Sequence, residues 1–302
     1  MRYCAIQEYD RRDPIRLMCR ALNVSPAGYY ACRSRPESHR AVSARTLLSA
    51  IRVIHQESRE TYGSPSIWGA RLKQGHGVGE HRVARLMRQH GIRAKTVKKW
   101  RATTQSHHRF PVAANTLNRQ FTVEYPNRVW AGDLTDIWTA EGWLYLAVVL
   151  DLYSRAVIGW ALEARLTGDL TQRALTMAIR HRTPKAGLLH HSDRGSQYAA
   201  TAYQPLLTTH GMTGSMSRRG NCWDNACVES FFGPLNRERI DHRQYRTRDE
   251  ATQDIVEYIE VFYHRLRRHS TLGYSSPAEF EARTAVASPG VHGIGGRSVA
   301  TG

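Results

Sequence analysis

The first hundred residues place apolar side chains at helical intervals. In the range 46–57 the leucines and isoleucines fall at i, i+1, i+4 and i+7, on one face of a helix. Glycine and proline breaks separate this segment from two further short helices predicted over 66–74 and 79–91. Upstream, 14–30 predicts two short helices, the second capped by Ser25 before a proline. This half of the chain is therefore predicted to be all-α, with a helix-turn-helix arrangement.

From residue 128 the apolar period changes from helical to strand-like. Tight turns separate strands over 129–139, 143–152 and 156–162, which predict an antiparallel meander. The predicted elements that follow are a helix over 167–181, a strand over 187–191, a helix over 201–210, a strand over 214–217 and helices over 223–240 and 248–269. This order predicts an α/β, ribonuclease-H-like fold, in which a mixed five-stranded sheet has flanking helices.

Charge is distributed unevenly between these two halves. Residues 1–120 hold 23 basic and 7 acidic side chains, a net +16, whereas residues 121–302 hold 20 and 19, a net +1. A basic module joined to a neutral one is typical of proteins that bind a polyanion, and nucleic acid is favoured over an anionic membrane. The basic run after residue 91 contains a tryptophan and supplies the predicted phosphate contacts, which are Arg93, Lys95, Lys98, Lys99 and Arg101.

Several protein classes are disfavoured by the sequence. The N-terminus has no apolar signal-peptide region, and the most apolar run, 143–152, is too short to span a bilayer as a helix. The five cysteines are odd in number and form no CxxC pair, which indicates reduced thiols rather than a disulfide framework or a zinc site. We therefore expect a cytoplasmic, nucleoid-associated protein with no membrane partner.

Pattern and charge together predict five segments. They are an N-terminal helical segment (1–42), a helix-turn-helix DNA-binding domain (43–105), a linker (106–126), a ribonuclease-H-like core with a C-terminal helix (127–283) and a disordered tail (284–302).

Three acidic residues occupy special positions in the predicted core. Asp133 lies inside the first strand, Asp193 directly follows the fourth, and Glu229 lies on the helix after the fifth. The first and fourth strands are neighbours in a ribonuclease-H-like sheet, and a helix across the sheet edge can supply a third acid. We therefore expect the three carboxylates to converge, although each one alone also fits a turn, a helix N-cap or a surface ion pair.

Three converging carboxylates have a chemical consequence. They cannot all ionise unpaired, so they must bind cations or have raised pKa values. Hard oxygen ligands suit Mg²⁺ or Mn²⁺, and two such ions about 3.5–4 Å apart activate a water or 3′-OH for in-line phosphoryl transfer. The nearest rival acids are expected elsewhere: Asp136 on the opposite strand face, Asp151 capping a turn and Asp224 off the helical face of Glu229.

The spacing and flanking motifs resemble those of a known family. Asp133, 59 residues, Asp193, 35 residues and Glu229 resemble the DDE triad of retroviral integrases and related transposases. Several motifs are similar to those of the OrfB product of insertion-sequence-three family transposases: Trp-Ala-Gly-Asp-Leu-Thr (130–135), His-Ser-Asp-Arg-Gly-Ser-Gln-Tyr (191–198), Asp-Asn-Ala-Cys-Val-Glu-Ser-Phe-Phe (224–232), His-Ser-Thr-Leu-Gly-Tyr (269–274) and Ser-Pro-Ala-Glu-Phe (276–280). The resemblance covers most of the chain.

This resemblance implies a DDE-type polynucleotidyl transferase that cuts the ends of its DNA element and joins them to a target, with Asp133, Asp193 and Glu229 as catalytic metal ligands. It also implies a homo-oligomer on DNA and an upstream OrfA product or fusion that supplies end recognition and a leucine zipper. No long heptad run appears in this sequence. Arg218, Arg219 and Arg237, near Glu229, are further predicted DNA contacts.

One stretch departs from the family pattern. After the glutamate the family usually reads Phe-Phe-Gly-Thr-Leu-Lys, whereas this chain reads Phe-Phe-Gly-Pro-Leu-Asn over 231–236. Pro234 is expected to kink or end the helix. Asn236 removes a cation that would hold a DNA phosphate, an expected loss of about 1–3 kcal/mol. Two alternatives remain open: a nuclease of the same fold without joining activity, and a catalytically degenerate DNA-binding regulator.

Overall fold

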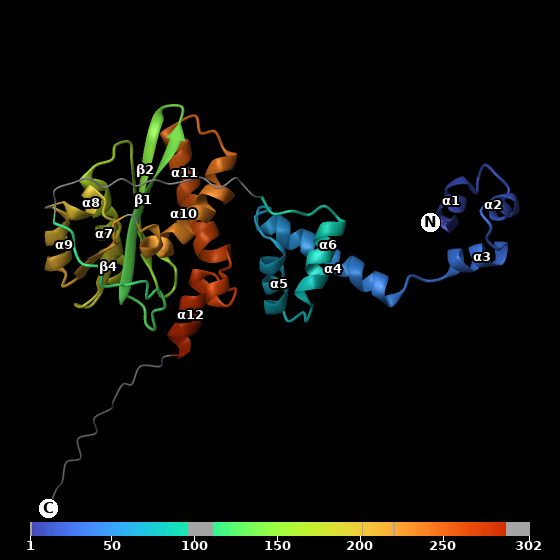
Figure 1. Cartoon of the computed structure of the whole chain (residues 1–302), viewed down its shortest axis with the longest axis horizontal. Coiled ribbons are helices and arrows are strands. Elements are labelled where there is room, and N and C mark those ends of the chain that lie inside the picture. Colours follow the sequence, from blue (N-terminus) through green and yellow to red (C-terminus); the bar gives the residue numbers. More distant parts are fainter. Residues whose placement is uncertain (1, 96–110, 201, 220, 288–302) are drawn as a thin grey trace, which may run out of the picture. The chain divides into compact units, whose positions relative to one another are not determined.

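The computed structural model describes residues 2–95, 111–200, 202–219 and 221–287 (Figure 1). The chain forms two compact units, Met1–Val53 and Ile54–Gly302. Three of the predicted DNA contacts, Lys98, Lys99 and Arg101, lie outside the described residues.

The first unit contains short helices. They are α1 (Arg2–Tyr9), α2 (Ile15–Ala21), α3 (Pro26–Ser34) and most of α4 (His39–Glu57). Ile6, Cys19 and Tyr29 form the small core of α1, α2 and α3. The Ser25 hydroxyl accepts the Gly28 N–H at 2.9 Å, which confirms the predicted cap. Helix α1 was not predicted, because its one buried side chain, Ile6, gives no apolar period.

The second unit begins with the end of α4 and a helix pair. Helices α5 (Ser64–Lys73) and α6 (Glu80–Gln89) confirm the two short helices predicted there. The indole N–H of Trp68 donates to the Val78 carbonyl at 2.8 Å and so joins α5 to the turn before α6. The structure therefore has the all-α region that the pattern predicts.

The core is a five-stranded mixed sheet. Its strands are β1 (Val129–Thr139), β2 (Gly142–Asp151), β3 (Val157–Glu163), β4 (Leu189–Ser192) and β5 (Thr213–Met216). They lie in the order β3-β2-β1-β4-β5. β1 and β3 pair antiparallel with β2, and β4 pairs parallel with both β1 and β5. The structure confirms the predicted antiparallel meander of β1, β2 and β3. It also confirms that β1 and β4 are neighbouring strands, as in a ribonuclease-H-like sheet.

Helices cover both faces of the sheet (Figure 1). One face holds α7 (Gly168–Arg182), α8 (Ser196–Ala199) and α9 (Tyr203–Thr209); the other holds α10 (Ala226–Glu238), α11 (Arg248–Glu257) and the π-helix η3 (Tyr258–Leu266). Three 3₁₀ turns, η1 (Cys222–Asn225), η2 (Ile240–His242) and η4 (Ser270–Leu272), and helix α12 (Pro277–Ala287) complete the unit. Helix α7 lies very close to β3, since a Cβ on Gly159 would stand 2.2 Å from the Ala174 carbonyl oxygen.

Three expectations about the helices of this unit are corrected. Pro234 does not end its helix, because α10 continues to Glu238. The residue before a proline normally clashes through its Cβ, and here that residue is Gly233, which has none. The helix predicted over 248–269 divides into α11 and η3 and ends at Leu266. The predicted tail begins too early, since α12 extends to Ala287; residues 288–302 lie outside the described residues.

The second half of the predicted linker is irregular but packs on the core. Leu117 is buried in the core, and the Ser215 hydroxyl on β5 accepts the N–H groups of Thr116 and Leu117 at 3.0 and 3.2 Å. A single buried leucine gives no periodicity, so the sequence offered no signal for this attachment.

Candidate active site within strand β1 and at the end of strand β4

Strand pairing places Asp133 beside Asp193. In the parallel register of β1 and β4, Gly132 lies opposite Ser192. Each aspartate is the residue that follows one member of this pair. The two carboxylates therefore occupy equivalent positions on neighbouring strands, as the sequence predicts.

The electrostatics of Asp133 agree with this placement. Burial raises the pKa of Asp133 well above its ordinary value, and the negative charge of Asp193 and then that of Glu229 raise it further. The Leu134 N–H donates to its Oδ1 at 2.9 Å, which opposes the shift without cancelling it. The Asp193 Oδ1 accepts the Gly195 N–H at 2.8 Å, so the turn after β4 orients that carboxylate. The site thus concentrates negative charge.

Glu229 lies on helix α10, which packs on the sheet that carries Asp133. It lies in the first turns of α10 and is exposed, while Val228, Phe231 and Phe232 anchor the helix in the core. Burial raises its pKa, and it acts electrostatically on Asp133. Within the part of the chain that the structure describes, no three His, Cys, Asp or Glu side chains are grouped as a metal site. The structure thus brings the two aspartates together, with Glu229 in electrostatic range.

Two of the three rival acids, Asp136 and Asp151, have surroundings that differ from those of Asp133. Asp136 is exposed. Asp151 is fully buried and accepts the N–H groups of Asn127 and Tyr153 at 3.1 and 3.0 Å, as expected for a turn cap, and burial raises its pKa to about 6.

Asp224 has a structural role that the sequence did not reveal. It is fully buried and accepts three hydrogen bonds from Arg218, one from Arg119 at 2.9 Å and one from Asn115 at 2.8 Å. The hydrogen bonds from Arg218 hold its pKa far below the ordinary value. Because Arg119 and Asn115 belong to the predicted linker, we name this set, Asn115, Arg119, Arg218 and Asp224, the Asp224 clamp. It attaches the linker to the loop before α10.

The histidines of β4 are buried and hydrogen-bonded to neighbouring elements. Burial lowers the pKa of His190 to about 3 and that of His191 to about 4, so both are neutral near pH 7. His190 Nε2 lies 3.2 Å from the Tyr203 hydroxyl, and His191 Nδ1 lies 3.0 Å from the Ser215 hydroxyl. These contacts position the strand that ends at Asp193.

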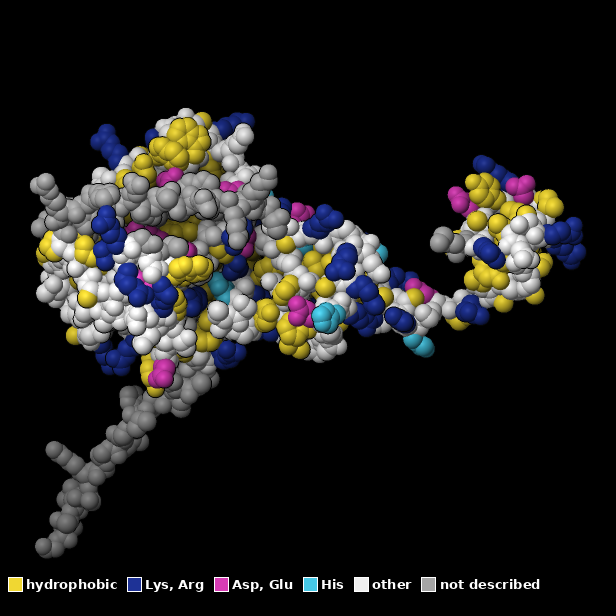
Figure 2. Space-filling model, in the orientation of Figure 1, with side chains coloured by type: hydrophobic (Ala, Val, Ile, Leu, Met, Phe, Trp, Pro, Cys, Tyr) yellow, Lys and Arg dark blue, Asp and Glu magenta, His cyan; other side chains and the backbone are white. Residues whose placement is uncertain are grey.

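The predicted DNA contacts have varied surroundings. Lys95 pairs with Glu60 at 3.3 Å, Arg218 belongs to the Asp224 clamp, and Arg93, Arg219 and Arg237 are not buried. Arg85 and Arg88, which were not among the predicted contacts, lie on the exposed face of α6. They alternate with the buried Val83, Leu86 and Met87 at helical spacing. Figure 2 shows Lys and Arg side chains on the visible face of the helices α4, α5 and α6.

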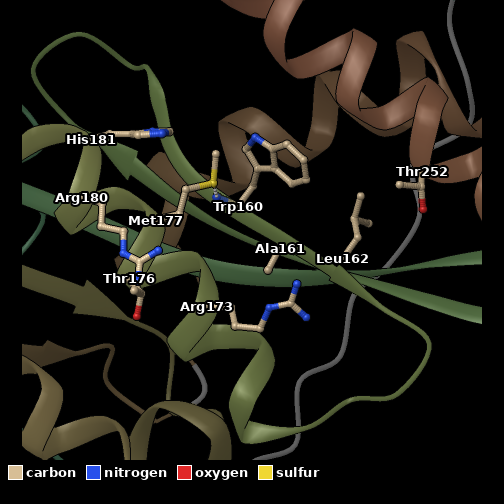
Figure 3. Close-up of a pocket in the computed structure, with 9 residues that line it drawn as sticks. All are labelled: Trp160, Ala161, Leu162, Arg173, Thr176, Met177, Arg180, His181 and Thr252. Carbon is tan, nitrogen blue, oxygen red and sulfur yellow. Dashed lines mark hydrogen bonds between the residues drawn. The ribbon is translucent and has the colours of Figure 1, made fainter.

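A hollow elsewhere on the core contains none of the three acids. It measures about 690 Å³ and lies between β3, α7 and α11 (Figure 3). Its lining is Trp160, Ala161, Leu162, Arg173, Thr176, Met177, Arg180, His181 and Thr252. Arg173 is paired with Glu163. The lining offers no carboxylate, so the candidate active site remains at Asp133 and Asp193.

Two further structural findings bear on the class of protein. Over the described ranges, none of the helices has the length and apolar character needed to cross a membrane. The four cysteines for which side chains are described, Cys4, Cys19, Cys32 and Cys227, are free thiols.

Comparison with known proteins identifies the family. Residues 43–100 match the model of an HTH-like domain, and residues 124–222 and 210–277 match two models of an integrase core domain. The chain is 47% identical over 266 residues to an uncharacterized 31 kDa protein of the insertion element IS600 of Shigella sonnei, covering 88% of this chain and 98% of that protein. It is 40% identical over 283 residues to the transposase InsF for insertion sequence IS3A of Escherichia coli K12, covering 93% of this chain and 98% of that protein.

A more distant likeness comes from a solved structure. The HTLV-2 integrase catalytic core domain in complex with magnesium aligns with a TM-score of 0.38 and 19% identity, covering 51% of this chain and 96% of that one. The family therefore rests on the sequence relatives and the domain models. The chain belongs to the insertion-sequence-three family of transposases.

Proposed function

We propose that this protein is a DNA transposase, a DDE-type polynucleotidyl transferase that cleaves the ends of its insertion sequence and transfers them to target DNA. One observation carries the proposal: the register of β1 and β4 places Asp133 and Asp193 side by side at the sheet. Family membership makes this the expected position of the chemistry, and Glu229 on α10 is the third acid of the proposed triad.

The donor set fits a divalent cation. Asp133 has a raised pKa because it is buried beside another carboxylate, and among the described residues the charged side chains that shift it are Asp193 and Glu229. Two bound Mg²⁺ or Mn²⁺ ions would activate the attacking oxygen and stabilise the leaving one. Asp133, Asp193 and Glu229 would hold them through hard oxygen ligands.

The chain's own residues supply orientation. The backbone of β1 and the Leu134 N–H hold Asp133, while the Gly195 N–H holds Asp193. Helix α10 is anchored through buried apolar residues, so Glu229 projects from a rigid element. Side chains held by packed strands and helices keep the ligand geometry that in-line phosphoryl transfer requires.

DNA binding is assigned to the basic half of the chain. We propose that residues 43–105 form its DNA-binding domain, with 1–42 before it, 106–126 as a connection and 127–283 as the catalytic core. Contacts would come from Arg93, Lys95, Lys98, Lys99 and Arg101, and Arg219 and Arg237 would hold DNA near the site. A homo-oligomer on DNA and an OrfA partner or fusion complete the proposal, and such a protein acts in the cytoplasm at the nucleoid.

The test is an assay of cleavage and joining with Mg²⁺ on DNA carrying the element's ends. Asp133→Asn, Asp193→Asn and Glu229→Gln should each lower the rate by more than about a hundredfold, since metal ions supply several kcal/mol to such reactions. DNA binding in Ca²⁺ should persist in all three. Near-normal activity of any one variant would overturn the triad, and cleavage without joined product would identify a nuclease instead.

A second measurement tests the DNA-binding half. For the whole chain, log K should fall with log salt concentration by about 0.9 for each phosphate neutralised. Arg85→Gln and Arg88→Gln on α6 should each reduce that slope by about one phosphate equivalent if they contact the backbone. A salt-independent affinity would contradict binding through phosphates.

A further inference from the structure

One tryptophan is displayed on the surface close in sequence to Glu229. Trp223 is 67% exposed, the largest exposed fraction among the large apolar side chains that the structure describes. It lies in the 3₁₀ turn η1, six residues before Glu229. Tryptophan is enriched in binding interfaces relative to the rest of the protein surface, so an exposed tryptophan is a candidate binding contact.

The backbone beneath Trp223 is held firmly. The next residue, Asp224, is fully buried in the Asp224 clamp and accepts hydrogen bonds from two arginines and an asparagine. The Trp223 carbonyl also accepts the Ala226 N–H at the start of α10. The backbone that carries the indole is therefore already ordered before binding, which lowers the entropy cost of binding.

The same loop is joined to the candidate active site. The Ser217 N–H donates to the Ser192 carbonyl at 3.0 Å, and the Arg194 side chain donates to the Ser217 carbonyl at 2.6 Å. Ser192 and Arg194 flank Asp193. The loop that carries Trp223 is thus connected to the Asp193 turn at one end and to the Glu229 helix at the other.

We propose that Trp223 stacks on an unpaired nucleobase of the DNA end held at the active site, a proposal that rests on the transposase function above. The exposed Arg218 and Arg219 lie in the same loop, and the half-exposed Arg119 is joined to it through Asp224. An aromatic ring among cations is the combination that binds single-stranded nucleic acid, because the ring stacks on a base while the cations contact the phosphates. Arg219 is exposed and lies outside the Asp224 clamp, so its charge is available to a phosphate, whereas a neutral protein partner would not require it.

The experiment uses the full chain in Ca²⁺ and a duplex whose short single-stranded overhang carries 2-aminopurine. Wild-type protein should quench the 2-aminopurine emission by stacking, and Trp223→Ala should abolish the quenching. Affinity for the overhang duplex should fall by about five- to a hundredfold, while affinity for a blunt duplex changes little. Trp223→Phe keeps an aromatic face and should retain most of both signals.

Trp138→Ala is the matched control. Trp138 is 59% exposed and packs against Trp143 in the β1–β2 hairpin, so it tests general loss of a surface tryptophan. Equal quenching by wild type and Trp223→Ala, or equal loss of affinity in Trp223→Ala and Trp138→Ala, would overturn the proposal. Neither the quenching nor the affinity measurement requires cleavage. If the triad variants were active, the catalytic assignment would fail, but the test of stacking by Trp223 would be unaffected.

Discussion

Two acidic residues in the same domain have opposite surroundings. Asp224 is buried with arginines and an asparagine, and its pKa lies far below the ordinary value because Arg218 donates to it. Asp133 has a carboxylate beside it instead, and burial together with Asp193 raises its pKa. The comparison shows how one domain uses acids for two purposes. A carboxylate paired with the protein's own cations stabilises the fold, and one with further negative charge beside it has the surroundings of the cation ligand that we propose for Asp133.

A third group extends the first of these cases. Glu238 at the end of α10 accepts hydrogen bonds from Arg267 through Nε and Nη2, at 2.9 to 3.1 Å, and one from the Tyr258 hydroxyl. Its neighbour Arg239 pairs with Asp254 at 2.7 Å. The helix that carries Glu229 is thus held at its far end by ion pairs that do not reach the active site.

The largest expected effect comes from breaking one of these buried pairs, Glu238–Arg267. Both side chains of the Glu238–Arg267 pair are less than a fifth exposed. Arg267→Met leaves the Glu238 carboxylate buried without its cation, so the free energy of unfolding should fall by about 3–5 kcal/mol. Chemical denaturation measures it.

Arg265→Met is the matched control, since Arg265 is exposed near the end of η3, two residues before Arg267. It should change stability by less than about 0.5 kcal/mol. Similar losses in the two variants would show that the buried pair adds nothing beyond the packing of a long side chain.

Replacing Asp224 and Asp133 in turn by asparagine tests whether the two acids have different roles. Asp224→Asn removes the charge that orients two half-exposed arginines, so the unfolding free energy should fall by about 2–3 kcal/mol. Asp133→Asn removes one of two adjacent like charges and should leave stability unchanged or raise it. Thermal unfolding without divalent metal distinguishes them; a loss in Asp133→Asn as large as in Asp224→Asn would refute the division of roles.

The sequence predicted the sheet well because its first three strands are apolar runs separated by tight turns. Asp133 and Asp193 followed from topology alone, since the register of β1 and β4 is set once the sheet order is known. The Asp224 clamp could not be predicted, because Arg119 lies more than a hundred residues away in a segment without periodicity. The helix break assigned to Pro234 was wrong because the rule for proline was applied without the glycine before it.

Asp151 offers an intermediate case with a distinct pH signature. It is buried like Asp224, but its bonded partners are two backbone N–H groups, and its pKa is about 6 against an ordinary 3.8. The folded state therefore holds a proton that the unfolded state has released between about pH 4 and 6. Stability from this group is present at low pH and is lost as pH rises through that window, by about 3 kcal/mol.

The measurement is the difference in unfolding free energy between wild type and Asp151→Asn across that range. Subtracting the variant removes the titration of all other groups. The unfolding free energy of the wild type, relative to that of Asp151→Asn, should fall as pH rises and become constant above the folded pKa of Asp151. A difference that does not vary with pH would mean that the carboxylate is solvated as in the unfolded chain.

The smallest expected effect concerns the cation that the family pattern places after the glutamate. Because α10 continues through Pro234, Asn236 lies two turns beyond Glu229 on the same helix and is partly exposed. Asn236→Lys should hold a DNA phosphate as a point charge and raise strand transfer about fivefold, or about 1 kcal/mol, the lower end for an exposed site. Pro234→Thr should add little, since the helix is already continuous. Strand-transfer rates for the single and double variants test this, with the thermal midpoint as control. If Asn236→Lys brings no gain, the exposed Arg237 already neutralises that phosphate, and the departure from the family pattern is functionally silent.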